Sequence, residues 1–458
     1  MIISKEKKKS QEIKSRVAEK NPRRNKVKKP IVVLACVLIL VGSLAIAGGQ
    51  KPRGEVEGAK TEQTTLKVWS IYTGGGRKEV FDKIVNEFES EYANIKVEQR
   101  RMADEPYGVD LQISLGKPEG PDVYFVYFGD MANQYLRADK VLVLDEYLSK
   151  DNWKESFEKA ALSATTYKGK TIGVPTDLGC KQWFYNKENF DSLGLNAPQT
   201  WDEWMDVCRK TKSGGFIPIL FANKNRWPAS HWINVLNQKL CGEDVTAQDY
   251  DPVFGGDFSD PGYVEALKRI DYVDNQGFFN EGYQGITYEE TQPLFAEGMG
   301  TMFWSWTSGM MDYPPKFEWG LFTFPAIPEG KGDQSYIVGG VQGFCVAKDS
   351  TKRAEAVQFL RFITRQDIAK IWVQTGKVSA VKGATTEETV PTKETLIDKR
   401  KIEQAGGVEV WLDRVLEVSI AEEYMNVIQG VLMGDMTAEE GMQYVREVAA
   451  EVKERLGS

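Results

Sequence analysis

The stretch that decides the fold is YKGKTIGVPTDLGCKQWFYNK, residues Tyr167–Lys187. After a polar turn it predicts a short apolar strand, Thr171–Val174. Pro175 closes this strand or lies at a sheet edge, because proline cannot donate to a β-ladder. Gly179 then lets the chain bend before a second apolar strand, Gln182–Tyr185. Two short strands joined by a flexible segment indicate a chain that crosses between two lobes.

The chain ahead of this stretch reads as a β-α-β unit. Leu66–Trp69 and Ile95–Val97 are short strand patterns, and the flexible turn Gly74–Gly76 follows the first of them. Between the strands, Arg77–Tyr92 has apolar residues at every third or fourth position, the pattern of an amphipathic helix. Asp122–Phe128 is almost continuously apolar, as in a strand buried on both faces. This order predicts an α/β fold with a parallel sheet covered by helices.

The N-terminus forms a separate segment. Residues 1–30 contain twelve Lys or Arg and three Glu, and Ile31–Ala47 follows with no charge. This pattern fits either a signal peptide cleaved after Ala45-Ile46-Ala47 or a retained membrane anchor. In both cases residues 48–65 are a linker, and the remainder is exported to the periplasm or the outer face of the cytoplasmic membrane.

Charge and composition exclude several kinds of partner and site. Since the whole chain carries −8 and residues 1–30 carry +9, the remainder carries −17, which argues against a nucleic-acid partner. A single histidine, His231, argues against His-built metal sites and His-dependent catalysis. No C-x-x-C spacing occurs, which argues against a zinc knuckle. A domain of this size does not need cross-links, so we favour free thiols over two disulfides for Cys180, Cys208, Cys241 and Cys345. We expect no metal and no cofactor.

Four weak motifs occur in a fixed order. They are G-K-x-x-G-V-P with Y-N-K at 169–187, P-x-T-W-x-E at 198–203, F-x-x-G-x-x-x-M at 295–302 with tryptophans after it, and a helical pattern at 354–362. In this order they resemble family 1 of the bacterial extracellular solute-binding proteins, the sugar-binding components of ABC importers. The resemblance extends over about residues 66–456.

The resemblance implies a two-lobe periplasmic-binding-protein (Venus flytrap) α/β fold with three hinge crossovers. The expected lobes are 66–177 with 327–378 (N-lobe) and 178–326 with 379–458 (C-lobe). One departure concerns the third crossover: many relatives have a proline after the position of Thr375-Gly376, where this chain has Lys377–Ala380. The position of that hinge is therefore left open.

Sugars present apolar C–H faces and many hydroxyls, so a sugar site needs aromatic platforms and planar polar groups. Both kinds of residue gather at the predicted turns. Trp69 and Trp183 fit a core position equally well, and of the alternating Trp304 and Trp306 we expect only Trp306 to face the cleft. The predicted ligand-binding residues are Trp69, Tyr72, Tyr127, Asp130, Asp177, Trp183, Trp227, Trp232, Trp304, Trp306 and Gln342.

The function implied by the resemblance is the extracytoplasmic substrate-binding component of a carbohydrate ABC importer. It would hold a sugar, by its aromatic content an oligosaccharide, between the lobes and deliver it to the transmembrane subunits of a permease. We expect a monomer without enzymatic activity. Two alternatives remain: a membrane-tethered sugar sensor for a two-component system, and a glycoside hydrolase, whose paired carboxylates the composition does not exclude.

Overall fold

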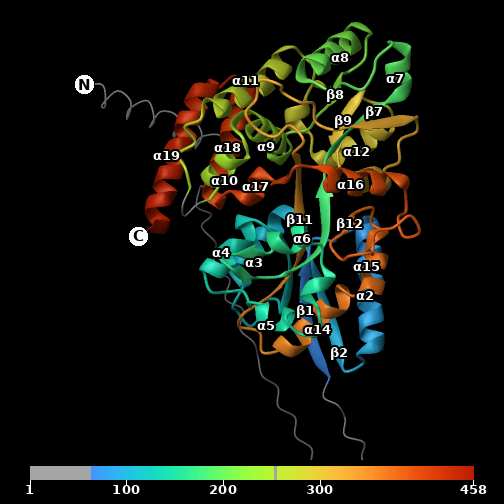
Figure 1. Cartoon of the computed structure of the whole chain (residues 1–458), viewed down its shortest axis with the longest axis vertical. Coiled ribbons are helices and arrows are strands. Elements are labelled where there is room, and N and C mark those ends of the chain that lie inside the picture. The colour runs from blue at the N-terminus through green and yellow to red at the C-terminus, as the bar shows by residue number, and fades with distance from the viewer. Residues whose placement is uncertain (1–62, 252–254, 458) are drawn as a thin grey trace, which may run out of the picture. The chain divides into compact units, whose positions relative to one another are not determined.

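Two β-sheets organise the part of the chain that the structure, a computed structural model, describes: residues 63–251 and 255–457 (Figure 1). The larger sheet has the strand order β12-β6-β11-β3-β1-β2, with β13 beside β11, and the smaller has the order β10-β7-β9-β8. The larger-sheet strands are β1 Thr64–Ser70, β2 Ile95–Arg101, β3 Val123–Tyr127, β6 Val174–Cys180, β11 Ile337–Val346, β12 Val378–Ser379 and β13 Val408–Val410. The smaller-sheet strands are β7 Gln182–Asn186, β8 Ile219–Leu220, β9 Met302–Ser305 and β10 Trp319–Phe322, and β4 Thr166–Tyr167 forms a hairpin with β5 Lys170–Thr171.

The predicted signal or anchor segment, 1–47, lies outside the described residues, as does the linker up to residue 62. Within the described ranges, no helix combines the length and the apolar character needed to cross a membrane.

The predicted β-α-β opening is present. Strands β1 and β2 pair in parallel, and α2, Gly75–Glu91, connects them. The apolar stripe of α2 is buried at Phe81, Ile84, Val85 and Phe88, because residues three and four apart share one helix face. Strand β3 pairs in parallel with β1, and four of its five residues are buried.

The opening stretch crosses between the sheets, but its strands differ from those predicted. Strand β6 starts at Val174, where the predicted strand ends, and Pro175 lies inside it. The strand accommodates Pro175 because its register with β11 shifts between Gln342 and Gly343. Gly179 pairs within the ladder and is no bend, so Lys181 alone separates β6 from β7. Figure 1 shows β6 running from the larger sheet toward β7.

The other two crossings occur later than the predicted lobe boundaries at 326/327 and 378/379. Residues 327–334 still contact α9, Trp227–Cys241, since Gln334 Nε2 donates to the Lys239 carbonyl (3.1 Å), and the chain joins the larger sheet only at β11. After β12, Val381 and Ala384 are buried in the larger-sheet core, so this segment does not begin the second lobe. β13 even returns to pair in parallel with β11.

Helices cover both sheets. On the side of the larger sheet they are α3 Asp104–Ser114, α4 Asp130–Arg137, α5 Asp145–Leu148, α6 Lys159–Ala164, α14 Arg353–Ile363 and α15 Gln366–Val373, with α16 Lys393–Gln404 beside β12. On the side of the smaller sheet they are α7 Lys187–Ser192, α8 Trp201–Ser213, α9, α10 Glu243–Asp249, α11 Pro261–Asn275, α12 Tyr288–Ala296, α13 Thr307–Asp312, α17 Leu412–Val415, α18 Val418–Leu432 and α19 Ala438–Gly457. We refer to each sheet with its helices as the larger-sheet and the smaller-sheet lobe.

The four cysteines predicted to be free thiols, Cys180, Cys208, Cys241 and Cys345, are all buried and unpaired in the structure. Each lobe buries a large apolar core, so the fold does not depend on cross-links for its stability.

Candidate functional site

Five aromatic rings surround the side-chain ammonium of Lys181, the residue between β6 and β7. The distances from Lys181 Nζ to the ring centroids are 4.7 Å for Trp227, 5.5 Å for Tyr288, 4.8 Å for Trp304, 4.9 Å for Trp306 and 5.9 Å for Trp411. Lys181 itself is only 4% exposed. We call these five rings with Lys181 the Lys181 cage.

These rings are held in place by elements that lie far apart in the sequence. Trp227 begins α9 and Tyr288 begins α12. Trp227 stacks on Trp306 with centroids 5.8 Å apart and an interplanar angle of 23°. Trp227 and Trp306 are half-buried, whereas Tyr288 and Trp304 are buried.

Trp304 and Trp306 both reach Lys181, contrary to the expectation that alternation would place only one of them there. The expectation was wrong because residues two apart in an extended segment lie on the same face, and Trp304 and Trp306 stand on either side of Ser305 at the end of β9.

The fifth ring, Trp411, is a residue that sequence reasoning missed. It follows β13 and lies against β11, where a Cβ added at Gly340 would be 2.4 Å from Trp411 Nε1. Its indole also stacks on the His231 imidazole at 4.5 Å. Only the pairing of β13 with β11, which no local pattern encodes, brings Trp411 to the strand crossing.

A chain of polar contacts leads from Trp411 to the larger-sheet lobe. His231 Nε2 lies 3.0 Å from Asp413 Oδ1, and Asp413 Oδ2 lies 3.2 Å from Arg414 Nε. Arg414 also pairs with Asp104 of α3 at 2.6 Å, and its guanidinium lies 4.4 Å from the ring centroid of Tyr127. These contacts join α17 in one lobe to α3 and β3 in the other.

Burial and neighbouring charges decide the protonation of this chain. Burial, with the positive charge of Lys181, lowers the pKa of His231 to about 4, although Asp413 opposes the shift. Burial alone would raise the pKa of Asp413, but Arg414 and His231 hold it at about 2. At neutral pH His231 is therefore a neutral imidazole that donates Nε2–H to the Asp413 carboxylate.

Burial also lowers the pKa of Lys181 well below its ordinary value, and Asp413 only partly opposes that shift. Lys181 Nζ makes no hydrogen bond and no ion pair with the described residues, so its close contacts in this part of the chain are with the ring faces.

The two predicted aspartates are engaged within the larger-sheet lobe. Asp177 is 1% exposed and contacts Lys377 Nζ at 3.0 Å, while Trp372 Nε1 and Thr176 Oγ1 donate to it at 3.1 Å and 2.9 Å. Asp130 is 2% exposed and pairs with both terminal nitrogens of Arg137. Their carboxylate oxygens hold the sheet and α4 together, and we do not keep them in the candidate site.

Four predicted aromatic residues are core residues. Trp69 and Tyr72 are each 2% exposed in the larger-sheet core, and Trp183 (0%) and Trp232 (1%) pack on each other in the smaller-sheet lobe with centroids 5.1 Å apart. Because no face of these rings is accessible, we also remove them from the candidate site.

Two predicted residues of the larger-sheet lobe remain. Tyr127 is half-buried under Arg414, and Gln342 pairs in register with Tyr127 on β3 and with Asp177 on β6. Gln342 Oε1 is buried and has no hydrogen-bond partner in the described part of the chain, so it is an unused acceptor. Gln342 and Gly340, on which Trp411 packs, point to the same face of β11.

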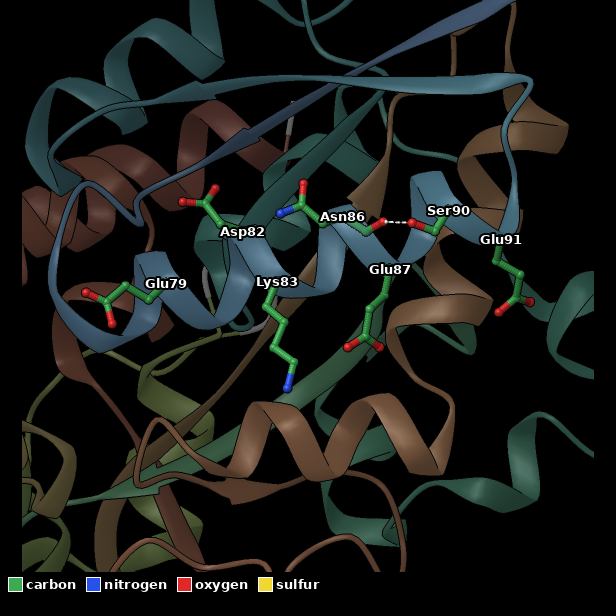
Figure 2. A pocket seen from close by; sticks show the side chains of 7 residues that line it. All are labelled: Glu79, Asp82, Lys83, Asn86, Glu87, Ser90 and Glu91. Atoms are coloured by element: carbon green, nitrogen blue, oxygen red, sulfur yellow. Dashed lines mark hydrogen bonds between the residues drawn. The ribbon is translucent and has the colours of Figure 1, made fainter.

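A surface hollow on α2 offers a different chemistry. Figure 2 shows its lining side chains along this one helix: Glu79, Asp82, Lys83, Asn86, Glu87, Ser90 and Glu91. It contains no aromatic ring and none of the predicted site residues. A solvated charged helix face explains it, so the Lys181 cage is the better candidate.

Comparison with known proteins defines the family. The profile described as bacterial extracellular solute-binding protein matches residues 74–370. The chain belongs to this family. An uncharacterised ABC transporter extracellular-binding protein of Pyrococcus horikoshii is 27% identical to this solute-binding protein over 314 residues, 65% of this chain and 68% of the relative. The multiple sugar-binding protein of Streptococcus mutans is 24% identical over 70% of this chain and 77% of its own.

A solved structure shows the same fold. The chitin oligosaccharide binding protein superposes on this solute-binding protein with a TM-score of 0.77, at 20% identity, covering 86% of this chain and all of the other. The predicted family and the two-lobe periplasmic-binding-protein fold are thus confirmed. The family and these neighbours are binding proteins, not enzymes.

Proposed function

We propose that this solute-binding protein binds a carbohydrate at the Lys181 cage and delivers it to an ABC permease. The observation that carries the proposal is the pair of stacked, half-buried indoles, Trp227 and Trp306, beside the strand crossing between the lobes. Indole faces match the apolar C–H faces of sugars. The name of the Streptococcus mutans relative, a multiple sugar-binding protein, supports a sugar ligand.

Polar atoms beside the rings would fix the orientation of the sugar. Gln342 Oε1 and His231 Nδ1 are buried acceptors without a partner in the described residues. Each can accept a sugar hydroxyl without giving up an existing hydrogen bond, and Lys181 Nζ can donate. Tyr127 and Gln342 belong to the larger-sheet lobe and the rings to the smaller-sheet lobe, so a bound sugar would be held from both sides.

The proposed cycle is hinge closure without chemistry. Periplasmic binding proteins close by hinge motion around their ligands, and the closed form would dock as a monomer on the transmembrane subunits of the permease. The exported location and the role of Ile31–Ala47 as a cleaved signal or anchor belong to the same proposal. Only contacts made by both lobes together would favour the closed state.

The test combines binding with product analysis. A thermal-shift screen of mono- and oligosaccharides identifies ligands, because a ligand that binds only the folded protein raises its melting temperature. Titration calorimetry then compares variants. We expect Trp306→Ala to weaken binding about tenfold or more, since a buried indole anchor contributes on the order of 2 kcal/mol.

Trp319→Ala is the matched control. Trp319 is also half-buried and lies in the smaller-sheet lobe, where it packs on Phe184 (centroids 5.2 Å apart) and is not one of the five rings around Lys181. Its loss should lower stability and leave affinity unchanged. A sugar recovered in pieces would replace the proposal with glycoside hydrolysis, and the absence of any binding glycan would refute it.

A further inference from the structure

Lys181 differs from the other fully buried lysines of the described chain. Lys239 Nζ donates to the Gln334 carbonyl at 2.7 Å, and Lys377 Nζ pairs with Asp177 at 3.0 Å. Lys181 Nζ has neither a carbonyl nor a carboxylate partner among the described residues, although it is 4% exposed. Its ammonium meets ring faces alone.

The rings attract this charge but replace none of the hydrogen bonds to oxygen that it makes in water. Removing an ammonium from water is unfavourable unless an anion and hydrogen bonds replace the water. Ring faces supply cation–π attraction, but they leave the three N–H donors without a protein oxygen as partner. Lys181 is therefore an incomplete ion pair at the place where the proposed ligand lies.

Among the residues that the structure describes, no carboxylate oxygen lies within ion-pair distance of Lys181 Nζ. Asp413, the carboxylate whose charge raises the pKa of Lys181, already binds His231 at 3.0 Å and Arg414 at 3.2 Å. Asp177 already binds Lys377. A carboxylate that pairs with Lys181 directly would therefore come from outside the protein.

We propose that the ligand of the Lys181 cage is an acidic carbohydrate, whose uronic-acid carboxylate pairs with Lys181 while its sugar rings pack on Trp227 and Trp306. This inference rests on the proposed function and names its substrate class. A carboxylate fits better than a phosphate, because one monovalent ammonium between ring faces balances a single negative charge. A phosphate dianion would call for several donors or a second cation, and Arg414 is already paired with Asp413 and Asp104.

The test uses pairs of oligosaccharides that differ only in a carboxylate. Titration calorimetry on the full-length protein compares trigalacturonic acid with its carboxyl-reduced form, and xylotriose carrying a 4-O-methylglucuronic acid branch with plain xylotriose. Galactose 6-phosphate tests the phosphate alternative. We expect the acidic member of a pair to bind at least tenfold more tightly, with an advantage that shrinks as salt is added.

Variants assign the preference to Lys181. Lys181→Met should remove the preference for the acidic member and raise the melting temperature of the free protein, because it replaces an unpaired buried charge by an apolar chain of similar length. Lys181→Arg should retain the preference. Lys224→Gln removes one exposed charge from the same lobe and should change neither property.

The two proposals fail in different ways. Equal binding within every pair, neutral sugars binding while acidic ones do not, galactose 6-phosphate binding better than the uronates, or a preference that survives Lys181→Met would overturn the acidic ligand and leave carbohydrate binding intact. If no acidic or neutral carbohydrate binds at all, the proposed function fails as well.

Discussion

At the scale of single residues, His231 shows how burial beside two opposite charges fixes a protonation state. It is the one histidine of the chain and is 5% exposed. It contacts Trp411, Asp413 and Trp227. The sequence argued against metal binding and catalysis by this histidine, and in the structure His231 stacks on Trp411, one of the rings of the Lys181 cage.

This state predicts a dependence of stability on pH. The folded pKa of His231 is about 4, below its ordinary value of 6.5, so between these values only the unfolded chain takes up the proton. Stability is therefore complete above pH 6.5 and is lost as the pH falls toward 4. Between pH 7.5 and 5 we expect a loss of about 2 kcal/mol from this residue, at 1.36 kcal/mol per pH unit.

Urea unfolding of the wild type and of His231→Gln at several pH values checks this. The difference between their unfolding free energies isolates one imidazole, because the chain has no other histidine. The difference should move by about 2 kcal/mol across this range, in favour of the variant at pH 5. A constant difference would mean that His231 titrates normally in the folded protein.

At the scale of elements, the crossing strand β6 depends on glycine in its partner β11. A Cβ added at Gly343 would lie 2.0 Å from the Val174 carbonyl oxygen, at the register shift opposite Pro175. We expect Gly343→Ala to destabilise the protein by about 1–3 kcal/mol, the cost of forcing atoms into a packed strand pair.

Gly179→Ala is the control for this prediction. Gly179 lies on β6 in the same ladder, and an added Cβ would meet nothing within 4 Å. Thermal unfolding should place this variant close to the wild type. If both alanine variants unfold at the same temperature, the close approach of β6 and β11 is not what restricts the size of the side chain at position 343.

Elements with a strong local pattern were predictable, and elements set by pairing were not. The stripe of α2 follows from a 3.6-residue period, and the capping box of α8 from Thr200 and Glu203. The local rule failed at Pro175, because β6 itself bulges at Thr176, between the residues that pair with Gln342 and Gly343, and a strand tolerates proline at a bulge. The local rule also failed at Trp411, because that ring is held in place by β11, which lies far from it in the sequence.

The same distinction explains the candidate site. Trp227 and Trp306 could be named from the sequence as tryptophans beside predicted turns. Burial removed Trp183 and Trp232 from the candidate site. The sequence cannot distinguish a tryptophan that forms a sugar-binding platform from one in the core, because both roles use the same side chain. Lys181 carried no signal of its own: only the convergence of five rings makes it notable.

At the scale of the whole described chain, residues 63–251 and 255–457, Arg414 is a polar link between the two lobes. It pairs with Asp104 and covers Tyr127 in the larger-sheet lobe, while Asp413 beside it binds His231 of α9. The backbone is close there as well: a Cβ at Gly129, which has a φ of +135°, would lie 2.7 Å from the Arg414 carbonyl oxygen. Contacts of this kind favour the arrangement in which the lobes touch.

Removal of this link should therefore shift the balance toward separated lobes. For Arg414→Met we expect a larger radius of gyration without ligand by small-angle X-ray scattering, and roughly tenfold weaker carbohydrate binding, because only the fraction of molecules with competent lobes binds tightly. Arg361→Met is the control: Arg361 also pairs with an aspartate, Asp151, and covers a ring, Trp153, but within one lobe. It should lower the melting temperature and leave both affinity and radius unchanged. If the two variants affect affinity equally, the Arg414 contacts stabilise the fold alone and closure depends on other residues.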